Sequence, residues 1–181
     1  NAFLARMVAG RAPGSALDIG IGEGRNAFFL ASRGWDVTGF DASAAGIKLT
    51  LAEADKRRLK VTALVGDVDS FDYGRAQWDL VAGLYMHEMV TRNAAKIVAS
   101  LKPGGVLVWI VGDATIDGCE TLTSMRQAIY FVDTAGFNMN DTMIYHRQGR
   151  FPEVFRYWQD FEFMFVLVKG KPKTFNALKE P

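Results

Sequence analysis

Three glycines, each separated by one residue, follow an apolar segment and precede a helix-like one, and this arrangement limits the fold most strongly. The apolar segment covers residues 16–19, and Gly20, Gly22 and Gly24 lead directly into the segment that starts at Arg25. Because glycine has no Cβ, the backbone can turn sharply there and a ligand can approach its amide groups closely. The pattern predicts a β-strand, a ligand-binding turn and an α-helix within an α/β fold.

Two later apolar segments also lead to a carboxylate. Asp41 ends the segment 35–41, about twenty residues after the turn, where an acidic residue accepts hydrogen bonds from ribose hydroxyls. Asp67 follows the segment 61–65. A strand-end turn or a helix cap is the alternative interpretation of each aspartate. Because Asp18, Asp41 and Asp67 end successive predicted strands, we favour contact with one ligand.

The glycine spacing bears on which nucleotide is bound. A dinucleotide fingerprint G-x-G-x-x-G would place its third glycine where Arg25 stands, and it serves a pyrophosphate. A nicotinamide-dependent oxidoreductase is therefore a weaker alternative.

Composition is consistent with one domain over residues 1–181, because the chain is 49% hydrophobic and can bury one substantial core. A formal net charge of +1 gives no strong attraction to nucleic acid or to a membrane surface. The single Cys119 suits a reducing compartment, so we expect a cytoplasmic location. No apolar run is long enough to span a bilayer and no signal-like segment opens the chain. The chain begins at Asn1 and not at Met, so a leader or a lid that precedes Asn1 in a longer protein is an open alternative.

Alternation of strand-like and helix-like segments predicts a doubly wound α/β fold with helices on both faces of a parallel sheet. We expect strands over 16–19, 35–41, 61–65, 78–82, 106–111, 138–146 and 161–169, and helices over 2–8, 26–32, 44–58, 91–101 and 121–135.

The first motif resembles that of the class I S-adenosylmethionine-dependent methyltransferases, acidic-x-G-x-G-x-G, with Asp18 in the acidic position. Leu-Lys-Pro-Gly-Gly at 101–105, before a strand, is also similar to that family. The resemblance implies a Rossmann-like, seven-stranded, mostly parallel sheet in which the last strand inserts antiparallel. It implies S-adenosylmethionine as cofactor and S-adenosylhomocysteine as product.

The resemblance also implies roles for individual residues. Asp41 would bind the ribose, Asp67 would accept a hydrogen bond from the adenine amino group, and Val68 would flank the adenine ring. The full set expected to bind the cofactor is Asp18, Gly20, Gly22, Gly24, Arg25, Asn26, Asp41, Ala42, Asp67, Val68 and Gly83.

Candidate catalytic residues lie in the loop 83–88, which would open beside the cofactor's methyl group. His87 is a candidate general base, with Glu88 to orient it and Tyr85 nearby. The alternative is that His87 and Glu88 simply begin a helix, where polar residues are ordinary. Transfer from a sulfonium needs little more than proximity and an in-line approach. We expect no metal site, because the two histidines and one cysteine show no paired ligand spacing.

The two parts of the chain resemble different branches of the family. Residues 1–105 are similar to small-molecule methyltransferases of the tellurite- or thiopurine-resistance type, on segments 1–5, 24–26 and 34–41. Residues from 106 onward resemble the C-terminal part of phage or restriction-type DNA amino-methyltransferases, on segments 108–115, 120–124, 141–144 and 160–167. This suggests a chimera with a fusion seam near 105–111. A single divergent methyltransferase is the alternative.

These observations lead to three hypotheses about the function of the protein. The first is methyl transfer to a small molecule. The second is a recombined or truncated fold that binds the cofactor without turnover. The third is a nucleic-acid binder derived from a DNA amino-methyltransferase. We do not favour the third, because Tyr85 is the only residue here that matches the D/N/S-P-P-aromatic motif of those enzymes. An exposed closing strand and a short first helix would favour self-association, such as a homodimer.

Overall fold

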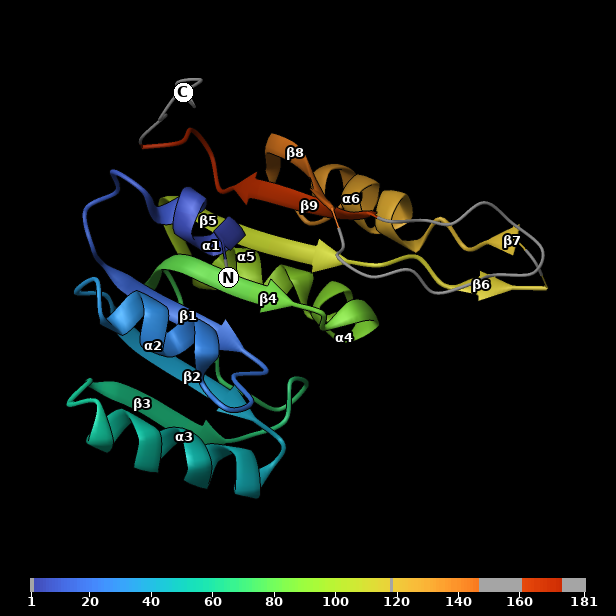
Figure 1. Ribbon diagram of the computed structural model, residues 1–181. Coiled ribbons are helices and arrows are strands. Elements are labelled where there is room, and N and C mark those ends of the chain that lie inside the picture. Colours follow the sequence, from blue (N-terminus) through green and yellow to red (C-terminus); the bar gives the residue numbers. More distant parts are fainter. Residues whose placement is uncertain (1, 118, 147–160, 174–181) are drawn as a thin grey trace.

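One seven-stranded sheet with the order β3-β2-β1-β4-β5-β9-β8 forms the centre of the computed structural model, which describes residues 2–117, 119–146 and 161–173 (Figure 1). Its strands are β1 Ser15–Ile19, β2 Asp36–Asp41, β3 Val61–Val65, β4 Trp78–Leu84, β5 Leu101–Val111, β8 Asn138–His146 and β9 Phe161–Val168. The helices are α1 Ala2–Val8, α2 Arg25–Ala31, α3 Ala44–Lys56, α4 His87–Arg92, α5 Ala94–Ser100 and α6 Thr123–Asp133.

Strand directions follow the predicted doubly wound pattern. The strands β3, β2, β1, β4 and β5 pair parallel to one another, whereas β9 lies antiparallel between β5 and β8. The chain leaves β1 toward β2 on one side and returns to β4 on the other, so the strand order reverses at β1. Ligands of open α/β sheets bind in the crevice at the carboxyl ends of the strands at such a point.

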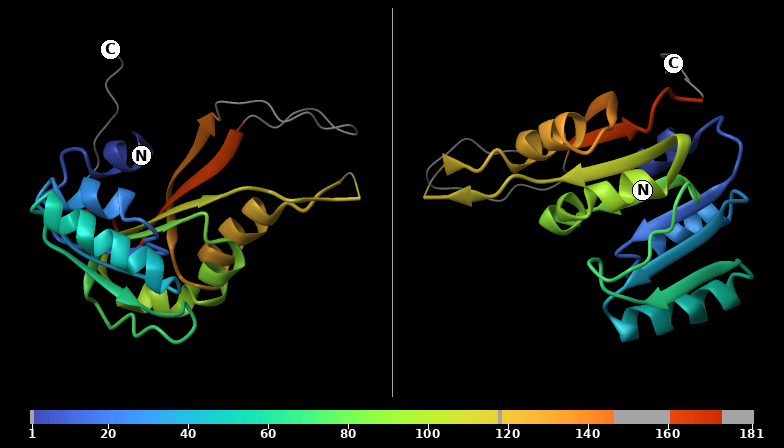
Figure 2. Two further views of the ribbon diagram at one scale, coloured as in Figure 1. Left: turned by 60° about the horizontal axis from the view of Figure 1, so that its bottom comes forward. Right: turned by 180° about the vertical axis from the view of Figure 1, so that it is seen from behind.

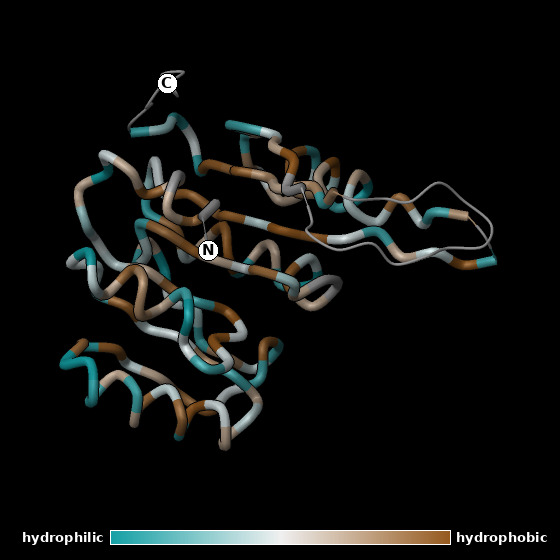
Figure 3. Tube along the Cα trace, viewed as in Figure 1, coloured by the Kyte–Doolittle hydropathy of each residue, from teal (hydrophilic) through white to brown (hydrophobic). Residues whose placement is uncertain are grey.

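Helices cover both faces of the sheet (Figure 2). Leu30 of α2 and Ile47 of α3 join the core on one face, and Val90 of α4, Ile97 of α5 and Phe131 of α6 join the core on the other. The central strands are hydrophobic along most of their length (Figure 3). A sheet buried on both faces requires such apolar strands, as the sequence predicted.

Strand β5 contributes to both cores because its side chains alternate between the faces. Trp109 points to the face of α4–α6, where its ring packs edge-on against Phe131 with 5.9 Å between ring centroids. Val108 and Ile110 point to the opposite core. Consequently β5 connects the two layers of the molecule.

The helices expected over 26–32 and 44–58 are Arg25–Ala31 and Ala44–Lys56 in the structure, and two other predicted helices differ more. The helix expected over 91–101 is two helices, α4 and α5, which meet at Asn93. The Asn93 side-chain amide donates to Asp69 Oδ1 at 2.7 Å and to Met89 O at 3.0 Å, a tertiary contact that helical periodicity does not reveal. The helix expected over 121–135 starts at Thr123 and ends at Asp133.

A short hairpin before α6 was not predicted. The strands β6 Thr115–Ile116 and β7 Cys119–Glu120 form a two-stranded arm that projects beyond the carboxyl end of β5 (Figure 1). Strand β5 also begins earlier than expected, because Leu101 pairs with Trp78 across a register shift. Among the described residues, no helix is both long and apolar enough to cross a membrane.

We expect Phe131→Ala to lower the free energy of unfolding by about 3–5 kcal/mol, because it removes a fully buried ring between Trp109 and Phe137. Urea unfolding measures this change. Ile129→Ala is the matched control, because Ile129 lies on the same helix and is 60% exposed. Equal losses in the two variants would contradict the assigned packing of α6.

Candidate functional site

The three glycines of the turn after β1 adopt backbone conformations that other residues rarely adopt. The φ angles of Gly20, Gly22 and Gly24 are +70°, +53° and +80°. The amides of Gly20 and Ile21 both donate to Phe40 O of β2 at 3.0 Å. Because an L side chain is strained at positive φ, the turn depends on glycine at these positions.

Space around the turn differs from one glycine to the next. A Cβ on Gly24 would lie 2.6 Å from Phe28 Cζ, and one on Gly20 would collide with the sulfur of Met86. A Cβ on Gly22 would meet nothing nearer than Gly20 O, at 4.0 Å. The outer glycines are therefore packed tightly, whereas the middle one faces open space through which a ligand can approach the backbone.

Helix α3 supports the turn from below. The buried Thr50 hydroxyl donates to Gly22 O at 2.8 Å, and a Cβ on Gly46 would lie 3.3 Å from the same oxygen. Our sequence analysis missed this contact. The only signal for it is the helical spacing of Thr50 with Ile47 and Ala54, which places a hydroxyl on an apolar face.

Asp41 joins the turn to the start of α3. One of its carboxylate oxygens accepts from Gly22 N at 3.0 Å, and the other accepts from Ser43 N at 2.8 Å. The side chain is half-buried, and the neighbouring Ala42 is exposed. A carboxylate has about four acceptor positions, so Asp41 retains capacity to accept further hydrogen bonds.

Asp18 is the buried acid of the site. Burial raises the pKa of its carboxyl to about 7; the backbone N–H of Ala27 lowers it in part, and the charge of Asp41 raises it further. The Oδ2 atom of Asp18 has no hydrogen-bond partner among the described residues. An unsatisfied carboxyl oxygen two residues before the glycine turn is suited to a cationic group of a bound ligand.

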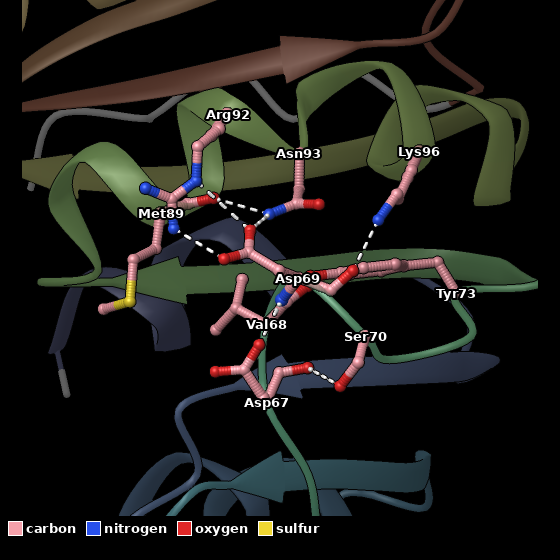
Figure 4. Close-up of polar contacts among 9 residues, drawn as sticks. All are labelled: Asp67, Val68, Asp69, Ser70, Tyr73, Met89, Arg92, Asn93 and Lys96. Atoms are coloured by element: carbon pink, nitrogen blue, oxygen red, sulfur yellow. Dashed lines mark hydrogen bonds and ion pairs between the residues drawn. The ribbon is translucent and has the colours of Figure 1, made fainter.

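Asp67 and Val68 begin the loop after β3 (Figure 4). Asp67 is exposed, and its Oδ1 accepts from Asp69 N at 2.8 Å. Val68 is 6% exposed, and its side chain belongs to the core that contains Phe40. The structure thus brings Asp67 to the same edge of the sheet as Asp41, with Gly66 N bonded to Asp41 O at 3.0 Å.

The remaining predicted residues surround the turn and the end of β4. Arg25 and Asn26 open α2; Arg25 is exposed and Asn26 is half-buried. Gly83 is buried on β4, where a Cβ would lie 3.1 Å from the ring of Trp109. Packing against Trp109 therefore accounts for this glycine, and its contact with a cofactor remains a prediction.

The loop after β4 holds the candidate catalytic residues. Tyr85 is 50% exposed, has a φ of +63° and donates its amide to Ile110 O at 3.2 Å. Such strain in a non-glycine residue clusters at functional sites. His87 and Glu88 begin α4, but their side chains lie outside the described part of the structure. Within that part, no group of three or more His, Cys, Asp or Glu residues could hold a metal ion.

Comparison with known proteins identifies the family. A family of methyltransferase domains matches residues 16–105, which contain the glycine turn, Asp41 and Asp67. Residues 16–105 belong to the class I S-adenosylmethionine-dependent methyltransferases. S-adenosylmethionine is the cofactor of this family, and the open approach to Gly22 and the unsatisfied oxygen of Asp18 fit a cationic nucleoside.

Two curated relatives of this methyltransferase match it over part of their length. The orphan methyltransferase M.BamHII of Bacillus amyloliquefaciens is 51% identical over 89 residues, which are 49% of this chain and 33% of that protein. Ribosomal RNA small subunit methyltransferase C of Alcanivorax borkumensis is 32% identical over 108 residues, 56% of this chain and 33% of that protein. The methyltransferase thus spans about a third of the length of these relatives.

Solved structures share the fold. A SAM-dependent methyltransferase from Methanosarcina mazei has a TM-score of 0.67 and 16% sequence identity, covering 86% of this chain and 92% of that one. At this identity the likeness establishes the Rossmann-like fold alone.

We expect Asp18→Asn to remove a pH dependence of stability. The folded pKa of about 7 lies above the unfolded value, so the native state binds the proton more tightly. Wild type should therefore lose stability as pH rises from about 4 to about 7, by on the order of 2–4 kcal/mol relative to the variant. Urea unfolding across this pH range measures the difference.

The control is Asp36→Asn, because Asp36 is exposed at the opposite end of β2. Parallel stability profiles for wild type and Asp18→Asn would show that Asp18 does not titrate in this range.

Proposed function

We propose that this methyltransferase transfers a methyl group from S-adenosylmethionine to a small molecule at the carboxyl edge of β1, β2 and β4. The observation that carries the proposal is the glycine turn, whose three positive φ angles leave Gly22 open to a ligand beside Asp41. The turn stands at the reversal of strand order, where α/β sheets bind their ligands.

The turn and three carboxylates each bind a different part of the cofactor. The turn from Gly20 to Asn26 presents its open face at Gly22 to the amino-acid end of the cofactor, and the buried Asp18 balances the positive charge of that end. Asp41 accepts hydrogen bonds from the ribose hydroxyls, and Ala42 lies next to it in the sequence. Asp67 accepts a hydrogen bond from the adenine amino group, and Val68 flanks the adenine ring. These roles combine the geometry above with the expectations from the family resemblance.

The loop 83–88 forms the acceptor side. The bound cofactor supplies a methyl group on a sulfonium, which is already reactive toward a nucleophile. The protein's task is then to hold the acceptor in line and exclude water. Tyr85 stands half-exposed at the end of β4, and we assign His87 as the general base with Glu88 to orient it.

A small-molecule acceptor has more support than nucleic acid. The net charge of +1 provides little attraction to a polyanion. Residues Ala82 to Tyr85 lack the two prolines and the polar residue expected for base amino methylation. The ribosomal RNA relative favours the second candidate, an RNA acceptor, on 32% identity over 108 residues. Binding without turnover is the remaining candidate.

The recombination hypothesis has structural support at β5. The matched methyltransferase domain ends at residue 105, where the expected seam of 105–111 begins. Within this segment, residues 106–110 pair in continuous register with β4, and residues 106–111 pair in continuous register with β9. A join at this strand would therefore leave no unpaired backbone. A natural gene that matches one family along its full length would contradict the hypothesis.

We expect Asp41→Ala to weaken S-adenosylhomocysteine binding by about 1–3 kcal/mol, because it removes charge-assisted hydrogen bonds to the ribose and to Gly22 N. Isothermal titration calorimetry measures the affinity, with NAD titrated in parallel. The control Asp36→Ala removes an exposed aspartate from the other end of the same strand. Unchanged affinity in Asp41→Ala, or tight binding of NAD instead, would refute the assigned cofactor site.

Turnover is tested separately with methyl-labelled S-adenosylmethionine. We expect label to appear in a small-molecule acceptor from a panel that also contains RNA and DNA. His87→Ala should slow this transfer without changing the affinity for S-adenosylhomocysteine. Label in RNA alone would support an RNA acceptor, and binding without any transfer would support a fold that binds the cofactor without turnover.

A further inference from the structure

The loop after β3 is fastened to α4 and α5 through one aspartate (Figure 4). Asp69 accepts from Arg92 at 2.6 Å and 3.2 Å and from the Asn93 amide at 2.7 Å. Lys96 Nζ donates to the backbone oxygen of Asp69 at 2.6 Å. We call Asp69, Arg92, Asn93 and Lys96 the Asp69 clamp.

The clamp is more than an exposed ion pair. Side chains of Asp69 and Arg92 are 50% and 54% exposed, and an isolated pair of this kind adds little stability. Asn93, however, is 3% exposed and lies at the junction of α4 and α5. Its side-chain amide donates hydrogen bonds to both Asp69 Oδ1 and Met89 O. Hydrogen bonds from Arg92 and then Asn93 hold the pKa of Asp69 below its ordinary value, so its carboxylate stays charged.

The clamp also affects Asp67, the proposed adenine ligand. Asp67 Oδ1 accepts from the backbone amide of Asp69, and Ser70 donates its hydroxyl to Asp67 O. Figure 4 shows the Asp67 carboxylate on the far side of Asp69 from Arg92 and Asn93. The direction of Asp67 therefore depends on the same short loop that the clamp holds.

At its other end α4 reaches the glycine turn. Met86 directly precedes α4 and packs on Gly20, where any side chain at position 20 would collide with the Met86 sulfur. Met86 is also packed against the core. Helix α4 therefore spans between the two loops that contact the proposed cofactor, and its first residues form the acceptor loop.

We propose that α4 responds to cofactor binding, with Asp69 and Arg92 as positioning residues that link Asp67 to the acceptor loop 83–88. This inference rests on the proposed function. Ordering of the adenine-side loop fixes Asp69, Asp69 fixes α4 through Arg92 and Asn93, and α4 fixes Tyr85 and Met86. The acceptor would then bind best after the cofactor, because its side of the site is ordered last. Coupling of this kind acts through a contiguous network of packed and hydrogen-bonded groups.

Hydrogen exchange with and without S-adenosylhomocysteine tests the coupling. In wild type we expect the ligand to slow exchange both at the glycine turn and in α4, with a change in α4 of about fivefold or more. In Arg92→Ala the turn should remain protected while the protection of α4 is lost. Arg92 is exposed on its helix, so this variant should fold; Asp69→Ala gives a second test of the same link.

Glu53→Ala is the control, because Glu53 of α3 forms comparable ion pairs with Lys56 and with the C-cap residue Arg57. It should leave the exchange pattern of α4 unchanged. Equal ligand protection of α4 in wild type and Arg92→Ala would overturn the proposal, as would a wild type in which only the turn responds. Absence of protection in both regions would instead refute the proposed cofactor site, and the coupling with it.

Discussion

The candidate site depends on the carboxylate of Asp41. Its two oxygens hold the amides of Gly22 and Ser43, and so fasten the glycine turn of β1 to the end of β2 and the start of α3. Thr50 secures the same turn from α3. Since glycine loses more conformational freedom on folding than other residues, a turn with three glycines needs such external contacts to stay in one shape. A polar network thus organises a loop that its own residues would leave flexible.

Most strands could be predicted from the sequence, and for the central strands β1, β4 and β5 the reason is burial. The segments 61–65 and 138–146 have the same bounds in the structure as in the prediction, although both are edge strands with mostly exposed residues. The placement of Asp41 and Asp67 at one edge of the sheet also followed from strand ends alone. In a parallel sheet, the order of elements along the chain already determines which ends meet.

Features that depend on contacts between distant residues could not be predicted. The break at Asn93 depends on Asp69, which lies 24 positions earlier, and Thr50 looked like an ordinary residue of a helix face. The start of α6 depends on Asp113, whose carboxylate accepts from the amide and the hydroxyl of Ser124. Local propensity carries no information about such pairings, so helix ends and polar networks were the parts that sequence analysis missed.

The central place of β1 has a consequence for biosynthesis. During translation β1, β2 and β3 emerge first and can pair with one another, but the crevice beside β1 lacks its second wall until Leu80 and Val81 reach Ala16 and Leu17. Pairing partners so far apart in sequence form slowly. A nascent chain halted before β4 would therefore leave one edge of β1 unpaired until the remaining strands leave the ribosome.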